Sequence, residues 1–162
     1  LDGHDAARFS KRLVREQKVA VAAGVDYDAT TRGPGMLYLH GSPSEGRTVA
    51  ELEAALRAEI ARVQKEGISE QELKRAKAQL LAAQVYKLDS VFGQAMEIGQ
   101  FESANLSYKL LDRNLERLQQ VTAAEVQAVA NKYFGDDTLT IGILDPQPLD
   151  GKPRRPAVAT RH

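Results

Sequence analysis

The side chains that could bind a metal are few in this sequence, and they are scattered along it. Its three histidines are His4, His40 and His162, and none has a second histidine or a carboxylate at the spacing of a metal site. Neither H-E-x-x-H nor H-x-x-E-H occurs. The sequence therefore predicts no metal-binding residue, and no cofactor, in this chain.

Nucleophilic catalysis is not indicated either. The chain has no cysteine, and its serines lie outside the G-x-S-x-G pattern that exposes a catalytic serine. The stretch from Gly33 to Gly35 is a glycine–proline turn, and the phosphate-binding pattern G-x-x-x-x-G-K-[ST] is missing. The carboxylates of Glu53, Glu70 and Glu72 are expected to lie in solvent on helix faces. We therefore predict no catalytic residue in this chain.

Composition limits the classes of partner. The 22 basic residues balance 22 acidic residues, whereas a nucleic-acid-binding domain usually carries a basic surplus. No apolar run approaches the roughly 20 residues that a membrane-spanning helix requires. The 162 residues, 43% of them hydrophobic, are enough for one globular domain with a core of its own. We therefore expect neither nucleic acid nor a membrane as a partner.

The first part of the chain predicts a helix followed by two strands. Phe9, Leu13 and Val14 recur at helical spacing, which predicts a helix over about residues 5–17. Residues 19–25 and 36–40 combine small, β-branched and aromatic side chains, and turn residues separate them. These two segments are expected to form antiparallel strands.

Helices are expected to follow, because the pattern S/T-x-x-E opens three amphipathic segments. In this capping box the hydroxyl accepts a bond from a free backbone N–H and the glutamate bonds back to the first residue. The three boxes are Thr48–Glu51, Ser69–Glu72 and Thr122–Glu125. The second of these helices is expected to kink near residues 89–90, and a further helix is predicted near 105–119.

The predicted order leads to a fold class. The alternating, β-branched segment 138–144 predicts a last strand, which must pair with the early strands. Strands followed by a run of helices indicate an α+β fold, with a mostly antiparallel mixed sheet covered on one face by helices. We expect residues 1–147 to form this domain and the Pro- and Arg-rich residues 148–162 to be a disordered tail.

The order and spacing of several motifs resemble those of a known family. Leu13-Val-Arg-Glu16 leads into the first strand, Gly67-Ile-Ser-Glu-Gln-Glu-Leu-Lys-Arg-Ala-Lys77 opens a helix, and Val121-Thr-Ala-Ala-Glu-Val126 opens another. Thr140-Ile-Gly-Ile-Leu-Asp-Pro146 closes the series. Together they resemble the C-terminal, non-catalytic domain of the pitrilysin/insulinase-type zinc metallopeptidases, which include the mitochondrial processing peptidases. The resemblance covers about residues 1–147, and the chain, which lacks a first methionine, is expected to be part of a longer two-domain protein.

The resemblance implies a role in peptide cleavage. Family members pair two similar halves around a closed chamber, and only one half carries H-x-x-E-H and binds zinc. The other half closes the chamber and holds the peptide. The implied partners are therefore a peptide substrate and a zinc-binding catalytic domain, in the same chain or in a partner subunit. Bacterial relatives occur in the cytoplasm and in the periplasm, with a preference here for the periplasm.

One residue can be assigned to the substrate by this resemblance. In many relatives an arginine and a tyrosine of the non-catalytic half grip the peptide. Arg15 stands at the place of the arginine, but the tyrosine is expected at position 21 or 22, where this chain has Val21 and Ala22. Tyr27 lies too far along the strand to replace it. The resemblance thus implies Arg15 as a substrate-binding residue in an incomplete pair; the alternative is a surface arginine that pairs with Glu16 or with a neighbouring helix.

Other functions remain open at this stage. The chain could be a structural relative whose partner is also inactive, or an unrelated α+β interaction module. An enzyme in its own right would need a pocket with converging polar groups of shifted pKa. An exposed sheet edge would also favour self-association of the isolated chain.

Overall fold

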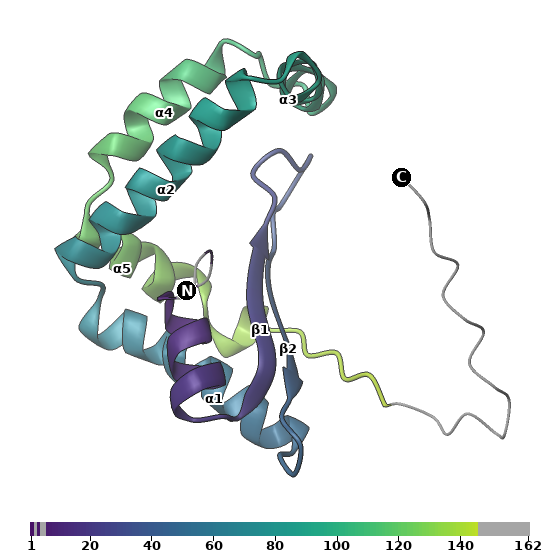
Figure 1. Ribbon diagram of the computed structural model, residues 1–162, viewed down its shortest axis with the longest axis vertical. Helices are drawn as coiled ribbons and strands as arrows, with labels where there is room; N and C mark the ends of the chain where they lie inside the picture. The colour runs from purple at the N-terminus through teal and green to yellow at the C-terminus, as the bar shows by residue number, and fades with distance from the viewer. Residues whose placement is uncertain (2, 4–5, 146–162) are drawn as a thin grey trace, which may run out of the picture.

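The computed structural model describes residues 1, 3 and 6–145, and it has the predicted α+β architecture (Figure 1). The strands β1 (Ala20–Tyr27) and β2 (Leu37–Pro43) form an antiparallel hairpin. A π-helix, η1 (Phe9–Glu16), precedes them. The helices that follow are α1 (Val49–Glu66), α2 (Glu70–Leu88), α3 (Val91–Ser103), α4 (Leu110–Gln120) and α5 (Ala123–Tyr133), and a short 3₁₀ helix, η2, spans Asp136–Thr138. The predicted tail, residues 148–162, lies outside the described residues.

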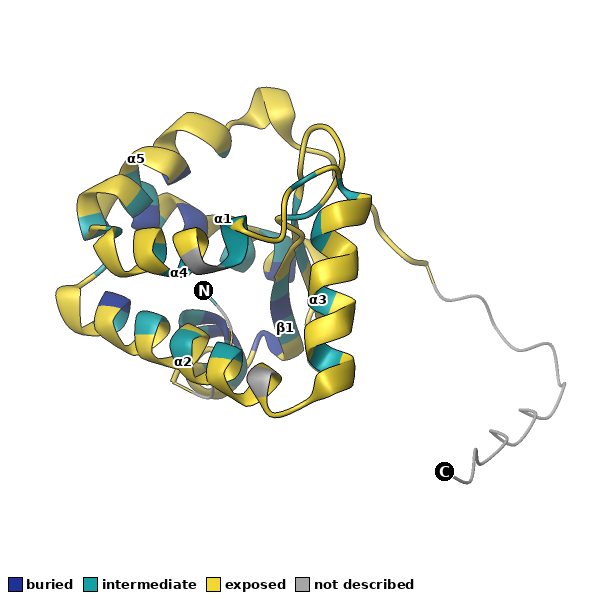
Figure 2. Cartoon of the chain, turned by 90° about the horizontal axis from the view of Figure 1, so that it is seen from above, coloured by how far each residue is buried: buried dark blue, intermediate teal, exposed yellow. Residues whose placement is uncertain are grey.

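The core forms where η1 and α1 pack on one face of the hairpin. Its buried residues come from all these elements and the turn between η1 and β1: Phe9, Leu13, Val19, Ala20 and Leu52. The backbone of Gly41 comes so close to Leu52 that a Cβ there would lie 3.2 Å from its Cδ2 atom. Figure 2 shows this burial concentrated around β1 and α1, whereas α2 and α3 are exposed over most of their surface. In the described part of the chain no helix combines the length and hydropathy needed to cross a membrane.

The predicted capping boxes set the starts of the helices. Thr48 and Thr122 each accept a bond from the backbone N–H three residues on, at 3.2 Å, and the glutamate there accepts the bond from the cap's own N–H. Ser69 also accepts from the N–H of Glu72 at 3.2 Å. The side chain of Glu72, however, does not return the bond, because it pairs with Arg8.

A reciprocal set of amide bonds joins α1 to α5. The Nε2 atom of Gln64 donates to the carbonyl oxygens of Ala130 and Phe134, at 3.1 and 2.9 Å. In return, Gln127 and Asn131 donate to the carbonyl oxygen of Gln64, at 2.9 and 3.1 Å. The carbonyl groups of Phe134 and Gln64, near the ends of the two helices, are therefore bonded by side chains of the other helix, and that of Ala130 accepts from Gln64 in addition to the N–H of Phe134, at 3.2 Å.

Two boundaries differ from the prediction for local reasons. The expected kink near residues 89–90 is a break between α2 and α3, and Ser90 caps α3 by accepting from the N–H of Gly93 at 3.1 Å. The helix predicted over 105–119 begins only at Leu110. Asn105 has a φ of 62°, a left-handed conformation that ends a helix and does not start one.

The predicted last strand is wrong. Within the described residues the sheet contains β1 and β2 alone, and residues 139–145 pair with neither. An ion pair from Arg57 to Asp136, at 2.7 Å, holds the turn at η2 against α1, and from this turn the chain leads away from the hairpin (Figure 1). β-branched residues favour an extended backbone, but a strand also needs a sheet edge within reach. Without that edge Leu144 stays 89% exposed.

Candidate functional site

Arg15 lies in the last turn of η1 and borders an open groove of about 450 Å³. Ser10 and Val14 of the same helix line one side of the groove, and residues 21–23 of β1 line the other. Side chains of a strand point alternately to its two faces. Residues 21–23 are consecutive, so a regular strand could not present all three side chains to the groove.

The strand is irregular beside Arg15. Ala20 is opposite Pro43 and Ala22 is opposite Ser42, so Val21 is an extra residue that forms a β-bulge. A bulge bends the strand and changes the direction of a side chain, and bulges often lie near functional sites. The bulged side chain of Val21 is exposed.

The structure thus brings Arg15 together with the positions where a tyrosine was expected. Val21 and Ala22 both line the groove, and neither has a hydroxyl group. Tyr27 is at the far end of β1, where its ring lies next to Gly35 of the hairpin turn. Tyr27 is not part of the groove lining.

The guanidinium group of Arg15 is exposed and lacks an acidic partner. Among the described residues no carboxylate lies within the 4.0 Å ion-pair distance of Arg15. Glu16, the partner that the sequence suggested, lies 3.8 Å from the Nζ atom of Lys11 instead. The charge of Arg15 is therefore available to a ligand.

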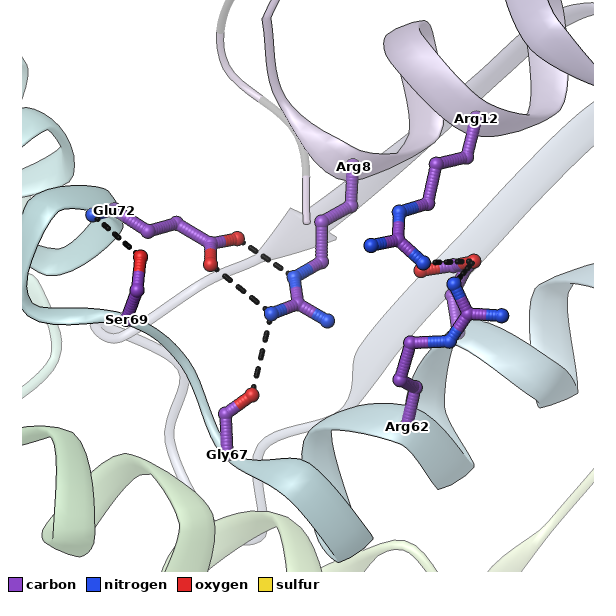
Figure 3. A network of polar contacts seen from close by, with 7 residues as sticks. Arg8, Arg12, Arg62, Gly67, Ser69 and Glu72 are labelled. Carbon is purple, nitrogen blue, oxygen red and sulfur yellow. Dashed lines mark hydrogen bonds and ion pairs between the residues drawn. The ribbon is translucent and has the colours of Figure 1, made fainter.

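A bidentate ion pair anchors the start of η1. The Nε and Nη2 atoms of Arg8 donate to the two carboxylate oxygens of Glu72 at 2.6 and 3.0 Å, and Nη2 also donates to the carbonyl oxygen of Gly67 at 3.2 Å (Figure 3). This hydrogen bonding raises the pKa of Arg8 and lowers the pKa of Glu72. The contact ties η1 to the junction between α1 and α2.

A second contact holds the middle of η1. Glu59 of α1 is buried, and its Oε1 atom lies 3.6 Å from Nη1 of Arg12 and 3.3 Å from Nη1 of Arg62 (Figure 3). Neither carboxylate oxygen has a hydrogen-bond partner of good geometry. Burial raises the pKa of Glu59. Arg15 thus sits at the end of a helix that is held at two points.

The other residues considered for chemistry do not converge. His40 lies on the exposed face of the hairpin, with Nδ1 3.2 Å from Oδ2 of Asp26. His4 and His162 lie outside the described residues. In the part of the chain that the structure describes, no three His, Cys, Asp or Glu side chains are placed to hold a metal ion. A second hollow, of about 600 Å³, lies between the hairpin turn and the turn from α3 to α4, and Arg32 lines it.

Sequence reasoning missed the ion pairs that anchor η1. Glu72 was expected in solvent, but it faces Arg8 across 64 positions of the sequence. Glu59 left a signal, because it falls among Leu52, Leu56 and Val63 on the apolar face of its helix. A lone carboxylate on such a face predicts a buried charge that needs a cationic partner.

Comparison with known proteins finds similarity to a peptidase family and to proteins described as proteases. The family described as the peptidase M16 inactive domain matches residues 1–80. The chain is 25% identical, over 132 residues, to the uncharacterized zinc protease YmxG of Bacillus subtilis strain 168. This match covers 80% of the chain and 32% of YmxG.

Two solved structures share the fold. A protease from Helicobacter pylori matches with a TM-score of 0.76 and 18% identity, over 83% of this chain and 32% of the protease. A protein described as a candidate zinc protease from Bordetella pertussis Tohama I matches with a TM-score of 0.77 and 20% identity, over 91% of this chain and 79% of that chain. The chain therefore spans about a third of the length of YmxG and of the Helicobacter protease.

Proposed function

This chain belongs to the peptidase M16 family through the inactive domain that its residues 1–80 match, and on that premise we propose that it is the non-catalytic half of a zinc-dependent metalloendopeptidase. The family resemblance found in the sequence is thereby confirmed. In the proposal the chain closes the substrate chamber and contacts the peptide. A partner half, in the same chain or in another subunit, binds zinc and cleaves.

The proposal divides the chemistry between the halves. Zinc-dependent hydrolysis needs protein ligands, an open coordination position for water and a base that activates the water. The described residues of this chain do not fit a zinc ion, as no such ligand group is assembled among them. We therefore assign zinc and the base to the partner half and only peptide contacts to this half.

The observation that carries the proposal is the position of Arg15. Its guanidinium group is exposed, has no acidic partner among the described residues, and borders a groove along β1. A guanidinium group has five N–H donors and no acceptor, so it suits the carbonyl oxygens of an extended peptide. The anchoring of η1 by Glu72 and Glu59 keeps this donor in a defined place at little entropic cost.

A cleavage assay tests the proposal. The protein that joins this chain to its catalytic half is incubated with a panel of quenched fluorescent peptides, with and without a chelator. We expect chelator-sensitive cleavage, and a loss of roughly threefold to tenfold in kcat/KM for Arg15→Ala, the range of one partly exposed charged hydrogen bond. Arg75→Ala, an exposed arginine of α2, is the matched control and should leave kcat/KM unchanged.

Two results would contradict the proposal in different ways. Absence of cleavage across the panel, with no zinc retained by the joined protein, would favour the structural relative with an inactive partner. Chelator-sensitive cleavage that Arg15→Ala and Arg75→Ala leave equally intact would keep the family role but remove Arg15 from the substrate.

A further inference from the structure

We propose that the outward face of α3 pairs two copies of this chain, with the two α3 helices antiparallel around a two-fold axis. The face consists of Val91, Phe92, Ala95, Met96 and Gly99, and the axis passes between the positions of Ala95 and Met96. The inference does not depend on the proposed function, because it concerns a different surface from the groove beside η1.

The helix α3 turns its polar side inwards and its apolar side outwards. Glu97 is the only charged residue in 91–100, and its side chain is 14% exposed where it meets Gln84 at 2.8 Å and Lys87 at 3.4 Å. Phe92, in contrast, is 76% exposed. Figure 2 shows α3 at the edge of the molecule, with most of its surface exposed. Because a helix normally buries its apolar side, this reversed pattern indicates a partner for the outward face.

Gly99 provides a recess on this face. Apart from its own helix backbone, a Cβ atom at Gly99 would meet no heavy atom of the described chain within 4 Å. A Cβ atom at Gly93 would lie 3.2 Å from the carbonyl oxygen of Lys87. The fold therefore explains the glycine at 93 but not the glycine at 99, where glycine weakens the helix relative to alanine. A glycine lets another molecule come close to the backbone, so Gly99 is placed to receive a side chain from outside this chain.

The large and small residues of the face match one another under a two-fold axis. Phe92 and Gly99 are about two helical turns apart, so they lie almost in line and about 10 Å from each other along the helix. An axis midway between them places Phe92 of each copy over Gly99 of the other. The same axis places Met96 of each copy over Ala95 of the other. An interface between two identical surfaces requires this kind of self-complementarity, and it identifies a second copy as the partner.

The charges and the size of the face fit a weak homodimer. Within α3, all of which the structure describes, the first turn has no acidic residue and the last turn has no basic residue to offset the helix dipole. In an antiparallel pair the N-terminus of each helix lies beside the C-terminus of the other, so partial charges of opposite sign meet. A helix about 20 Å long covers less than the roughly 800 Å² per partner of a stable complex. We therefore expect a dissociation constant on the order of 100 µM.

Sedimentation equilibrium of the chain, from about 10 µM to about 1 mM, tests the inference because this range spans the expected dissociation constant. We expect the average mass to rise from that of a monomer towards that of a dimer. Phe92→Ala and Gly99→Phe should each weaken the dimer roughly tenfold, since the first removes the inserted side chain and the second fills the recess. Tyr133→Ala, which removes an exposed aromatic side chain from α5, is the control and should leave the dissociation constant unchanged. Circular dichroism checks that each variant keeps its helix content.

The double variant Phe92→Ala with Gly99→Phe tests the geometry of the pair. It exchanges the large and the small position, so two copies can again fit together, and we expect an affinity within about threefold of the original chain. General apolar adhesion predicts the opposite for Gly99→Phe alone, which adds exposed apolar surface and would tighten the association. Three results would overturn the proposal: a monomer at every concentration, a Gly99→Phe variant that associates as tightly as the original chain, or a double variant weaker than both single variants.

Discussion

The buried carboxylate of Glu59 makes a prediction that goes against the usual cost of changing a core residue. Glu59 is 1% exposed, and its two cationic neighbours, Arg12 and Arg62, are 31% and 33% exposed. We predict that Glu59→Met stabilises the folded chain at neutral pH. Methionine has a similar volume and no charge, and the two arginines can turn to water once the carboxylate is gone.

The magnitude follows from the surroundings of the carboxylate. Burial of an ionised carboxylate costs several kcal/mol even after relaxation. The contacts at 3.3 and 3.6 Å offset part of this cost, but neither oxygen gains a hydrogen bond of good geometry. Replacement of a buried ion pair by apolar residues of similar volume is neutral or stabilising by up to about 4 kcal/mol. Since solvent already screens both arginines of Glu59, we expect a gain of about 1–2 kcal/mol.

The pH dependence of the gain in stability provides a second, independent test of the reasoning about Glu59. Burial raises the pKa of Glu59 above its ordinary value of 4.5, so the folded state holds the proton more tightly than the unfolded chain. Stability is therefore lost as the pH rises from 4.5 through the raised pKa, and the methionine variant escapes this loss. The advantage of the variant should be smallest below pH 4.5 and largest at neutral pH. Urea unfolding followed by circular dichroism, at pH 4 and at pH 7.5, measures the gain in stability and its change with pH.

A matched substitution separates this reasoning from a general effect of removing glutamates. Glu72→Met removes the same charge from the other anchor of η1, but it leaves the guanidinium group of Arg8 without its carboxylate partner. The side chain of Arg8 is only 12% exposed, and it donates two bonds to Glu72. We expect this variant to lose about 2–4 kcal/mol of stability, since breaking a buried pair leaves an uncompensated charge. The reasoning is refuted if Glu59→Met loses more than about 1 kcal/mol at pH 7.5 and shows no pH dependence, for the ion pairs would then outweigh the burial cost.

Two further predictions concern the helix ends. Thr48→Ala should lower the stability by about 1 kcal/mol, the cost of one lost N-cap, and Thr48→Ser should restore most of it, as urea unfolding can show; a neutral alanine variant would mean that water caps α1 equally well. Gln64→Ala should cost about 1–2 kcal/mol and speed the hydrogen exchange of α5, because the carbonyl group of Phe134 loses its side-chain donor and that of Ala130 keeps only the N–H of Phe134. Unchanged exchange in α5 would show that the amide bonds do not couple the two helices.

The elements that the sequence predicted well are those with local signals. The capping threonines at 48 and 122 each bond to a glutamate three residues away, so a short stretch contains the whole interaction. The two early strands and their order are also confirmed, with β2 extending to Pro43. The family resemblance rested on such helix-start motifs in sequence order, and the match to residues 1–80 agrees with it.

The predictions that failed needed distant partners. Residues 138–144 have the composition of a strand, but strand formation depends on a sheet edge within reach, and after the turn at η2 the chain leads away from the hairpin (Figure 1). The start of α4 moved to Leu110 because Asn105 adopts a left-handed backbone conformation, which helical spacing of leucines cannot reveal. In both cases the local sequence favoured the predicted element, but the course of the folded chain prevented it from forming there.

The sequence by itself determined the helix starts, the α+β class and the place of Arg15 directly before a strand, because these depend on residues close together in the chain. Only the tertiary structure decided that Arg15 borders a groove next to Val21 and Ala22, that it has no acidic partner among the described residues, and that Glu72 and Glu59 anchor its helix. These features join residues separated by up to 64 positions. Whether a charge is paired or free is a property of the folded chain. Burial and the distance to other charges set its energy, and the local sequence determines neither.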